Sequence, residues 1–324
     1  MRSSRTALAL PLALMLTACG TTSATAPETK GADAAFPMSV TDCGEQLRIE
    51  QQPRKIFTVG TAAVATLDAA GASDRIAYRS GEFGAELPTG LAHSPTDATI
   101  VDPSDPGTEA ILDTDADAVY GYGLFNAKAD QLSDQEIALL TVQGECGHDA
   151  GDTGSGVTFS TVTDDITRLG RIFGTSPTAE ESARTITETV AEQHKRAPEG
   201  SGSVAWLYYF GSSEPLSAYG RGGMPNEVME QAKLKNVYAS ESKTYLKVTP
   251  ESLLEHNPRS IILTYGLYGE DAATLKKKFL NEPGADRLDA VKEGRIIMLP
   301  AGSAEPSPTA VGGLTALVDH LSKG

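Results

Sequence analysis

Tyrosine and arginine side chains gather in segments that follow short apolar runs of the 324-residue chain. Seven of the ten tyrosines lie at or just after the ends of such runs: Tyr120, Tyr122, Tyr208, Tyr209, Tyr219, Tyr265 and Tyr268. A tyrosine ring offers a flat face for stacking and a hydroxyl for hydrogen bonding. Arg79 and Arg221 stand in similar segments, where a guanidinium can hold a carboxylate through two hydrogen bonds or can anchor the loop itself. Noncovalent binding is the chemistry these residues indicate, although Tyr120 and Tyr208, inside apolar runs, also suit a core.

Sequence motifs of covalent or metal-dependent catalysis are poorly represented. The chain has no GxSxG, GxxxxGKS or HExxH pattern, and Ser240-Glu-Ser-Lys243 lacks the companion motifs of a Ser-x-x-Lys enzyme. His148 stands in a polar loop, and the remaining histidines form no closely spaced pair, so a zinc or manganese site cannot be assembled. We expect no metal site, no cofactor and no enzymatic activity; an α/β hydrolase-type enzyme is the alternative from another class.

Strand-like and helix-like segments alternate along the chain and must position the tyrosines. Strands are expected at 55–59, 76–78, 118–120, 204–210, 260–265 and 296–299, and helices at 62–70, 130–140, 163–173 and 176–196. Repeated β-α units predict parallel sheets with both faces covered. Because ligands bind beyond the carboxyl ends of strands in open α/β sheets, the tyrosine-bearing loops are expected to line one cleft.

One long helix is expected between two similar halves of the chain. Ser176 suits the N-cap, Pro177 the first helical position, and Pro198 follows the end. Its length of roughly 30 Å is sufficient to cross from one lobe to another. Residues 109–123 and 251–266 share a pattern of Glu, apolar pair, polar stretch, strand and Tyr-Gly. The expected fold is α/β, with two Rossmann-like lobes of mostly parallel sheets, a ligand cleft between them, and boundaries 39–175, 176–198 (the interlobe helix) and 199–324.

The N-terminus has the features of an export signal. Two arginines precede an apolar run at residues 7–16, which is too short and too proline-interrupted for a permanent membrane helix. The following Leu-Thr-Ala-Cys19 resembles the lipobox of bacterial lipoproteins, the alternative being an ordinary secretory signal. We therefore expect a signal peptide at 1–18, lipidation of Cys19, a flexible tether at 19–38, and a protein anchored by lipid to the cell membrane on its extracytoplasmic side.

Net charge and cysteine usage narrow the partners further. The chain carries 27 Lys and Arg against 43 Asp and Glu, a formal charge of −16, which argues against a nucleic-acid partner. With Cys19 assigned to lipid, Cys43 and Cys146 remain in a compartment where pairing is favoured. A disulfide between them is expected, and two separate buried thiols are the alternative.

In the order of its features the chain resembles the ABC-importer substrate-binding lipoproteins for ferric siderophores, haem and cobalamin. The resemblance covers nearly all of residues 40–321 and is carried by the lipobox, the two Glu-to-strand repeats, the long helix, and the segments 53–56 (PRKI), 69–76 (AAGASDRI), 222–229 (GGMPNEVM) and 290–297 (AVKEGRII). Asp42-Cys43-Gly44 together with Cys146 looks most like actinobacterial iron-siderophore members, which supports the disulfide. Asp115-Ala-Asp117, where the family usually has Lys-Pro-Asp, departs from the pattern in a turn.

The resemblance implies a monomeric binding protein that captures a ferric siderophore between two lobes and delivers it to an ABC permease dimer with its ATPase. Haem and cobalamin are the alternative ligands. The expected ligand-binding residues are Arg79, Tyr122, Tyr209, Tyr219, Arg221, Tyr265 and Tyr268. The resemblance also implies that Glu109 and Glu251, at the starts of the two repeats, pair with arginines of the permease; stabilisation of a helix N-terminus is the alternative role of these carboxylates.

Overall fold

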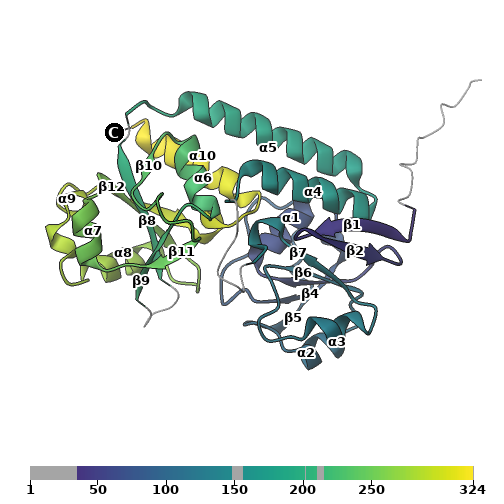
Figure 1. Ribbon diagram of the computed structural model, residues 1–324. Helices are drawn as coiled ribbons and strands as arrows, with labels where there is room; N and C mark the ends of the chain where they lie inside the picture. Colours follow the sequence, from purple (N-terminus) through teal and green to yellow (C-terminus); the bar gives the residue numbers. More distant parts are fainter. Residues whose placement is uncertain (1–34, 148–155, 201, 210–214, 324) are drawn as a thin grey trace, which may run out of the picture. The chain divides into compact units, whose positions relative to one another are not determined.

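Five parallel strands form the sheet of the N-terminal lobe in the computed structural model, which describes residues 35–147, 156–200, 202–209 and 215–323 (Figure 1). Their order across the sheet is β5-β4-β3-β6-β7. The central strands are buried along their whole length, as continuous apolar runs in parallel sheets require. The bounds are β3 (Ile56–Val59), β4 (Ile76–Ser80), β5 (Thr99–Asp102), β6 (Ala118–Gly121) and β7 (Ala138–Thr141).

Helices cover both faces of this sheet. On one face, α1 (Thr61–Ala69) and α4 (Phe159–Phe173) pack in the same apolar cluster as Ile56. On the other, α2 (Thr108–Leu112) and α3 (Ala129–Ser133) contribute Ile111 and Leu132 to a cluster with Phe57. Consecutive strand residues point to opposite faces, so Ile56 and Phe57 serve the two cores. A short 3₁₀ turn, η1 (Ser73–Arg75), leads into β4.

The helix predicted at 130–140 is wrong in its second half. Helix α3 ends at Ser133, Glu136 turns the chain with φ 61°, and Ala138–Thr141 forms the edge strand β7. The spacing of Leu132, Ile137 and Leu140 fits a helix, but the unbroken apolar stretch that begins at Ile137 equally fits a buried strand, and pairing with β6 decides between them.

An antiparallel hairpin that the sequence analysis did not anticipate precedes the first lobe. It consists of β1 (Met38–Asp42) and β2 (Glu45–Ile49). Cys43 in its turn is bonded to Cys146, with 5.3 Å between the Cα atoms, which confirms the predicted disulfide. Asp42 also forms an ion pair with Arg168 of α4. The hairpin is therefore attached to the lobe by a covalent and an ionic link.

The expected long helix is present as α5 (Ser176–Arg196). It packs against α1 and α4 of the first lobe and against α6 (Met224–Gln231) and α10 (Thr309–Leu321) of the second (Figure 1). Its approach to α4 is close, since a Cβ atom placed on Gly170 would lie 2.3 Å from the Cβ of Ala179. The helix is thus fixed to both lobes by side-chain packing.

The sheet of the second lobe is mixed. Its order is β11-β9-β8-β12-β13, with β10 also paired to β8; β9 and β11 run antiparallel to their neighbours. The bounds are β8 (Ser203–Tyr209), β9 (Leu216–Tyr219), β10 (Lys235–Asn236), β11 (Tyr245–Lys247), β12 (Ser260–Tyr265) and β13 (Ile296–Pro300). The prediction of two α/β lobes is confirmed, and the second sheet adds antiparallel strands to its parallel core.

Helices again cover both faces of the second sheet. Helices α6 and α10 lie on the face of Trp206. The opposite face, that of Leu207, carries α7 (Pro250–His256), α8 (Ala272–Leu280) and α9 (Asp289–Lys292). Short 3₁₀ turns stand at Gln143–Glu145 (η2), Ala285–Arg287 (η4) and Ala301–Ala304 (η5). Within the described part of the chain, no helix combines the length and apolarity that crossing a membrane would require.

Candidate ligand-binding site

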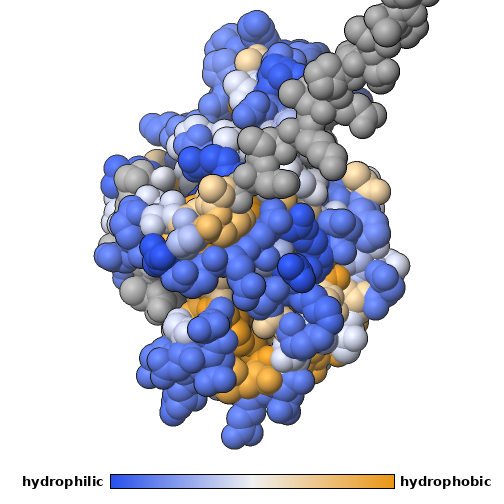
Figure 2. Space-filling model, turned by 90° about the vertical axis from the view of Figure 1, so that its right-hand side faces the viewer, coloured by the Kyte–Doolittle hydropathy of each residue, from blue (hydrophilic) through white to orange (hydrophobic). Residues whose placement is uncertain are grey.

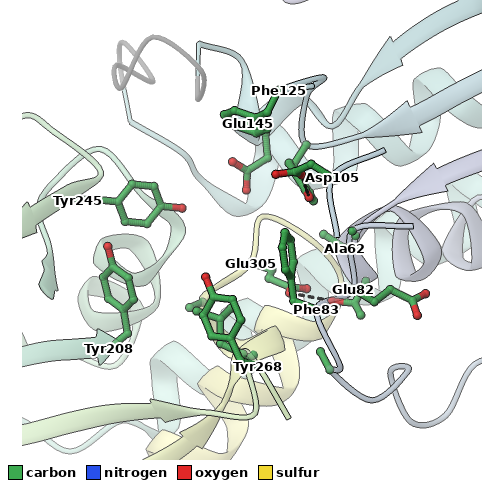
Figure 3. A pocket seen from close by; sticks show the side chains of 18 of the residues that line it. Ala62, Glu82, Phe83, Asp105, Phe125, Glu145, Tyr208, Tyr245, Tyr268 and Glu305 are labelled. Carbon is green, nitrogen blue, oxygen red and sulfur yellow. Dashed lines mark hydrogen bonds between the residues drawn. The ribbon is translucent and has the colours of Figure 1, made fainter. Parts of the chain in front are cut away.

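A cavity of about 610 Å³ lies where the loops beyond the strands of both lobes meet. Its size falls in the range of roughly 300–1,000 Å³ that is common for small-molecule sites. The first lobe contributes aromatic and acidic side chains, namely Glu82, Phe83, Asp105, Tyr122, Phe125 and Glu145. The second contributes Tyr208, Tyr219, Tyr245, Tyr268 and Glu305 (Figure 3). Both lobes would therefore touch one ligand.

Three tyrosines of the second lobe form one aromatic wall. The ring of Tyr208 lies 4.6 Å from that of Tyr219 and 5.6 Å from that of Tyr245, measured between centroids. Burial raises the pKa of all three hydroxyls, so they remain protonated and neutral at physiological pH. The wall offers ring faces for stacking and neutral hydroxyls for hydrogen bonds.

Tyr122 is the principal aromatic group on the first lobe. A Cβ on Gly60 would lie 2.6 Å from its ring, and one on Gly81 would lie 2.6 Å from its hydroxyl, so the ring requires glycine at both positions. Both glycines also have positive φ, 90° and 68°. The hydroxyl donates to Asp105. Burial, followed by this bond to Asp105, raises the pKa of Tyr122 and keeps the donor protonated.

The two lobes touch each other at one side of the cavity. The rings of Phe83 and Tyr268 meet edge to face, with 5.7 Å between centroids. Beside them the backbones come close, since a Cβ on Gly269 would lie 2.9 Å from the carbonyl oxygen of Gly84. The Tyr268 loop is held by Glu270, which accepts hydrogen bonds from the backbone amides of residues 266 and 268 at 3.1 and 3.0 Å.

Glu305 joins the second lobe to the first beneath this contact. The hydroxyl of Thr61, in the first turn of α1, donates to its Oε1 at 2.8 Å (Figure 3). Its Oε2 is buried and has no hydrogen-bond partner among the described residues. Burial raises the pKa of Glu305 to about 7; the bond from Thr61 opposes the shift and the charge of Glu145 adds to it. At neutral pH the protonated form of Glu305 is therefore favoured far more than that of an exposed glutamate.

Three of the seven expected ligand-binding residues, Tyr122, Tyr219 and Tyr268, line the cavity. Arg79 is 6% exposed and directs its guanidinium to Glu82 at 3.0 Å, so it lies behind the lining rather than in it. Burial raises the pKa of Glu82 although Arg79 opposes the shift. Arg221 is exposed and is not among the lining residues.

Tyr209 and Tyr265 lie on the other side of the second sheet. Tyr209 alternates with Tyr208 along β8 and therefore points into the opposite core, where its hydroxyl donates to Glu282 at 2.9 Å. The ammonium of Lys278 lies 3.6 Å from its ring centroid. Tyr265 packs against the same core and lines a neighbouring cavity of about 820 Å³.

Several lining residues were not singled out in the sequence. Phe83, Phe125 and Glu305 stand in the loops that follow β4, β6 and β13, and a position within a few residues of a strand end was the available signal. Tyr245 belongs to the three-residue strand β11, which has no clear sequence pattern. Tyr208, judged to fit a core, is 1% exposed and yet lines the cavity.

The other expected functional residues are distributed over the surface and the N-terminus. Glu109 and Glu251 are exposed in the first turns of α2 and α7. A backbone amide and the Thr249 hydroxyl hold the pKa of Glu251 below its usual value. Cys19 and His148 lie outside the described residues.

Comparison with known proteins agrees with the two-lobed α/β fold described above. Residues 56–302 match the family model described as periplasmic binding protein. No protein with a curated description matches the sequence. A solved structure titled ABC-type Fe³⁺-hydroxamate transport system, from Saccharomonospora viridis, is 26% identical with a TM-score of 0.75, and the alignment covers 90% of this chain and 100% of that one.

Two further solved structures resemble the chain in fold. A periplasmic binding protein from Veillonella parvula is 19% identical with a TM-score of 0.72, over 89% of this chain and 98% of that one. The periplasmic heme-binding protein RhuT from Roseiflexus is 15% identical with a TM-score of 0.66, over 83% of this chain and 98% of that one.

Proposed function

The chain belongs to the periplasmic binding protein family, whose members act outside the cytoplasm, and from this premise we propose that it captures a ferric siderophore and delivers it to an ABC importer. The observation that carries the proposal is the cavity lining, in which aromatic rings of both lobes surround about 610 Å³ together with a few hydrogen-bonding groups. A ferric siderophore is a bulky, partly apolar chelate with polar oxygens, which such a lining suits. Similarity to the Saccharomonospora Fe³⁺-hydroxamate protein supports this ligand.

The ligand contacts in this proposal are Tyr122, Tyr219 and Tyr268, joined by Tyr208 and Tyr245 of the aromatic wall.

Haem is the second candidate ligand. A tyrosine hydroxyl can ligate haem iron, and the resemblance to the heme-binding protein from Roseiflexus favours it.

Binding rather than catalysis is proposed for the cavity. The hydroxyl of Thr61 and the carboxylate of Glu305 are hydrogen-bonded there, but the described lining contains no His, Lys, Cys or Ser to complete a catalytic set. The family consists of binding proteins, which supports the same conclusion.

Quenching of tryptophan and tyrosine fluorescence tests the proposed ligand. We expect saturable quenching by at least one ferric hydroxamate, with a Kd below about 1 µM. The panel includes ferric catecholates, haem and cobalamin, and the absence of quenching by any ferric siderophore would overturn the proposal. Tyr219→Ala is expected to weaken binding by roughly tenfold or more. Tyr209→Ala is the matched control, because it removes an equally buried ring from the opposite face of the same sheet.

Docking to the permease dimer is assigned to Glu109 and Glu251. Each stands on a different lobe in the first turn of the helix that begins one of the two sequence repeats. Leu112, on the same helix as Glu109, is 38% exposed. Figure 2 shows a hydrophobic area low on the side formed by the first lobe. Exposed apolar surface beside a charge suits a protein partner.

Lipid attachment at Cys19 completes the proposal. It accounts for the lipobox-like Leu-Thr-Ala-Cys19 and would hold the protein at the membrane beside its permease. Replacing this cysteine, Cys19→Ala, is expected to move the protein from the membrane fraction to the soluble fraction. Retention of the variant in the membrane fraction would contradict lipid anchoring through Cys19.

A further inference from the structure

We propose that closure of the two lobes is coupled to protonation of Glu305, so that the protein holds its ligand more tightly in mildly acidic solution than in mildly basic solution. The inference rests on the proposed binding function and adds a means of regulating the same site. It follows from the position of one carboxyl group at the boundary between the lobes and from the hydrogen bonds that this group makes.

Glu305 lies at the boundary between the lobes. It follows directly on η5 in the second lobe, and its Oε1 accepts the hydrogen bond from Thr61 in the first turn of α1 in the first lobe. Both residues line the cavity and also the neighbouring cavity of about 820 Å³, so this hydrogen bond lies where the two cavities adjoin. The contact of Phe83 with Tyr268 joins the lobes beside it (Figure 3). Glu305 is therefore enclosed by both lobes only while they remain in contact.

The surroundings of Glu305 favour the protonated side chain in this closed arrangement. Its Oε1 has one neutral donor, and its Oε2 is buried with no hydrogen-bond partner among the described residues. Burying a carboxylate costs much more than burying a protonated carboxyl group unless charged or additional donors compensate. Burial accordingly raises the pKa of Glu305 to about 7, although the bond from Thr61 opposes the shift.

The groups that face Glu305 are acidic or phenolic. Four carboxyl groups line the cavity, those of Glu82, Asp105, Glu145 and Glu305 itself, and the neighbouring cavity adds Asp68, Glu86, Glu270 and Asp271. The phenols are those of the aromatic wall, Tyr122, Tyr265 and Tyr268. Among the described residues that line either cavity, none is Lys, Arg or His. No described lining group therefore favours ionisation of Glu305 by a positive charge.

Charged groups outside the two linings leave this balance in place. Arg79, behind the lining, is paired with Glu82. Helices α6 and α10 pack against η5, but their charged and titratable residues line neither cavity: Glu227, Glu230, Asp319 and His320. Glu145 has a smaller effect than burial and acts in the same direction on the pKa of Glu305. Burial between the lobes is thus the main cause of the preference for the protonated form.

Separation of the lobes would remove this burial. Movement of Thr61 away from Glu305 would admit water to the carboxyl oxygens, and the pKa would return toward its ordinary value of 4.5. A group whose pKa is higher in the closed form takes up a proton when the lobes close. The contribution of Glu305 to closure is therefore fully present below pH 4.5 and is lost as pH rises through about 7.

Distances between spin labels on the two lobes test the coupling without any ligand. Labels are attached at Gln131→Cys on α3 and Lys277→Cys on α8, two exposed positions on different lobes. From about pH 8 to about pH 5.5 we expect the ratio of closed to open populations to rise roughly tenfold. Glu305→Gln keeps an acceptor for Thr61 but cannot ionise, so its ratio should not change with pH. Glu86→Gln removes an exposed carboxyl group of the neighbouring cavity and is the matched control, expected to behave as the wild type.

Ligand affinity gives the second measurement. Ferrioxamine E, a cyclic ferric tris-hydroxamate, is uncharged at both pH values, so a change in its Kd reports on the protein. We expect its Kd to be roughly tenfold lower at about pH 5.5 than at about pH 8 in the wild type and equal at both in Glu305→Gln. Thr61→Val removes a donor that favours ionisation and should move the midpoint of the pH dependence to higher pH, which a purely structural role of Glu305 does not predict.

The outcomes separate the two proposals. Unchanged distances in the wild type, a shift of the same size in Glu305→Gln, or a Kd that is independent of pH would overturn proton-coupled closure and leave siderophore capture intact. A pH-dependent shift in the wild-type distances, without binding of ferrioxamine E or of any other ferric chelate in the panel, would support the coupling and overturn siderophore capture.

Discussion

Glu305 is the residue whose ionisation the fold changes in a directly measurable way. Its pKa is raised to about 7, so the folded protein retains a proton there that the unfolded chain releases near its usual value. The contribution of Glu305 to stability is therefore expected to fall as pH rises from about 4.5 to about 7, by about 3 kcal/mol at most, and to stay lower above that range. The loss of stability arises because the ionised carboxylate of Glu305 is buried and its Oε2 accepts no hydrogen bond from the described residues.

Replacing this carboxyl by an amide should remove the pH-dependent cost. Glu305→Gln can still accept the hydrogen bond from Thr61 but carries no charge. At pH 8 we expect the free energy of unfolding to rise by about 1–3 kcal/mol, whereas at pH 4.5 the two proteins should be equally stable. Urea denaturation at both pH values measures the difference. A stability gain of the same size at both pH values would contradict the assignment of the raised pKa to Glu305.

Residue-scale prediction from the sequence succeeds where position along a strand is unambiguous. Tyr122 directly follows β6, and Tyr268 stands in the loop beyond β12; both reach the cavity. Tyr208 and Tyr209 are adjacent, so alternation allows only one of them to do so, but an unbroken apolar run does not tell which. The carboxylates were missed because acidic residues occur throughout this chain and only the fold brings these four together.

At the scale of elements, the contact between α4 and α5 depends on a residue without a side chain. Gly170→Ala should destabilise the protein by about 1–3 kcal/mol because its Cβ would lie 2.3 Å from that of Ala179, although alanine is the better helix former. Gly312→Ala, on α10, is the control: its Cβ meets nothing within 4 Å, so it should stabilise by up to about 1 kcal/mol. Thermal unfolding of both variants measures the contrast, and two changes of the same sign would refute the packing argument.

Long elements were predictable and short ones were not. The α5 segment carries its signals locally, with Pro177 at its start, Pro198 beyond its end and an apolar stripe that includes Ile186. By contrast, β10 and β11 have two and three residues, too few for any period, and exist through pairing with β8 and β9. The same dependence on tertiary pairing turned the end of the predicted 130–140 helix into β7.

At the scale of the whole molecule, the proposed docking acids act as a pair because they stand on different lobes. Reversing both charges, Glu109→Lys with Glu251→Lys, should lower siderophore uptake by cells roughly tenfold while the Kd for the chelate stays the same. Asp113→Lys with Glu255→Lys is the matched control, since both residues are exposed, Asp113 at the C-cap of α2 and Glu255 within α7. Reduced uptake in both double variants, or in neither, would exclude a specific role for the two acids.

The two-lobed architecture was predictable because the Glu-to-strand repeat and the long helix are encoded locally, whereas the close contact between lobes was not. The edge-to-face meeting of Phe83 with Tyr268, and the approach of Gly84 to Gly269, join residues nearly 190 positions apart in the sequence. No local pattern specifies such a contact, which arises only when both sheets and the helices that join them are in place.

The disulfide between Cys43 and Cys146 links the oxidation of the chain to the structure of the cavity. Cys146 is the immediate neighbour of Glu145, which lines the cavity. The bond to Cys43 therefore connects this part of the cavity lining to the turn of the β1–β2 hairpin. A thiol reductant that opens the bond would release this tie, and the freshly made, reduced chain lacks it. We therefore expect the oxidised protein to bind its ligand more tightly than the reduced protein, so that oxidation precedes full binding competence.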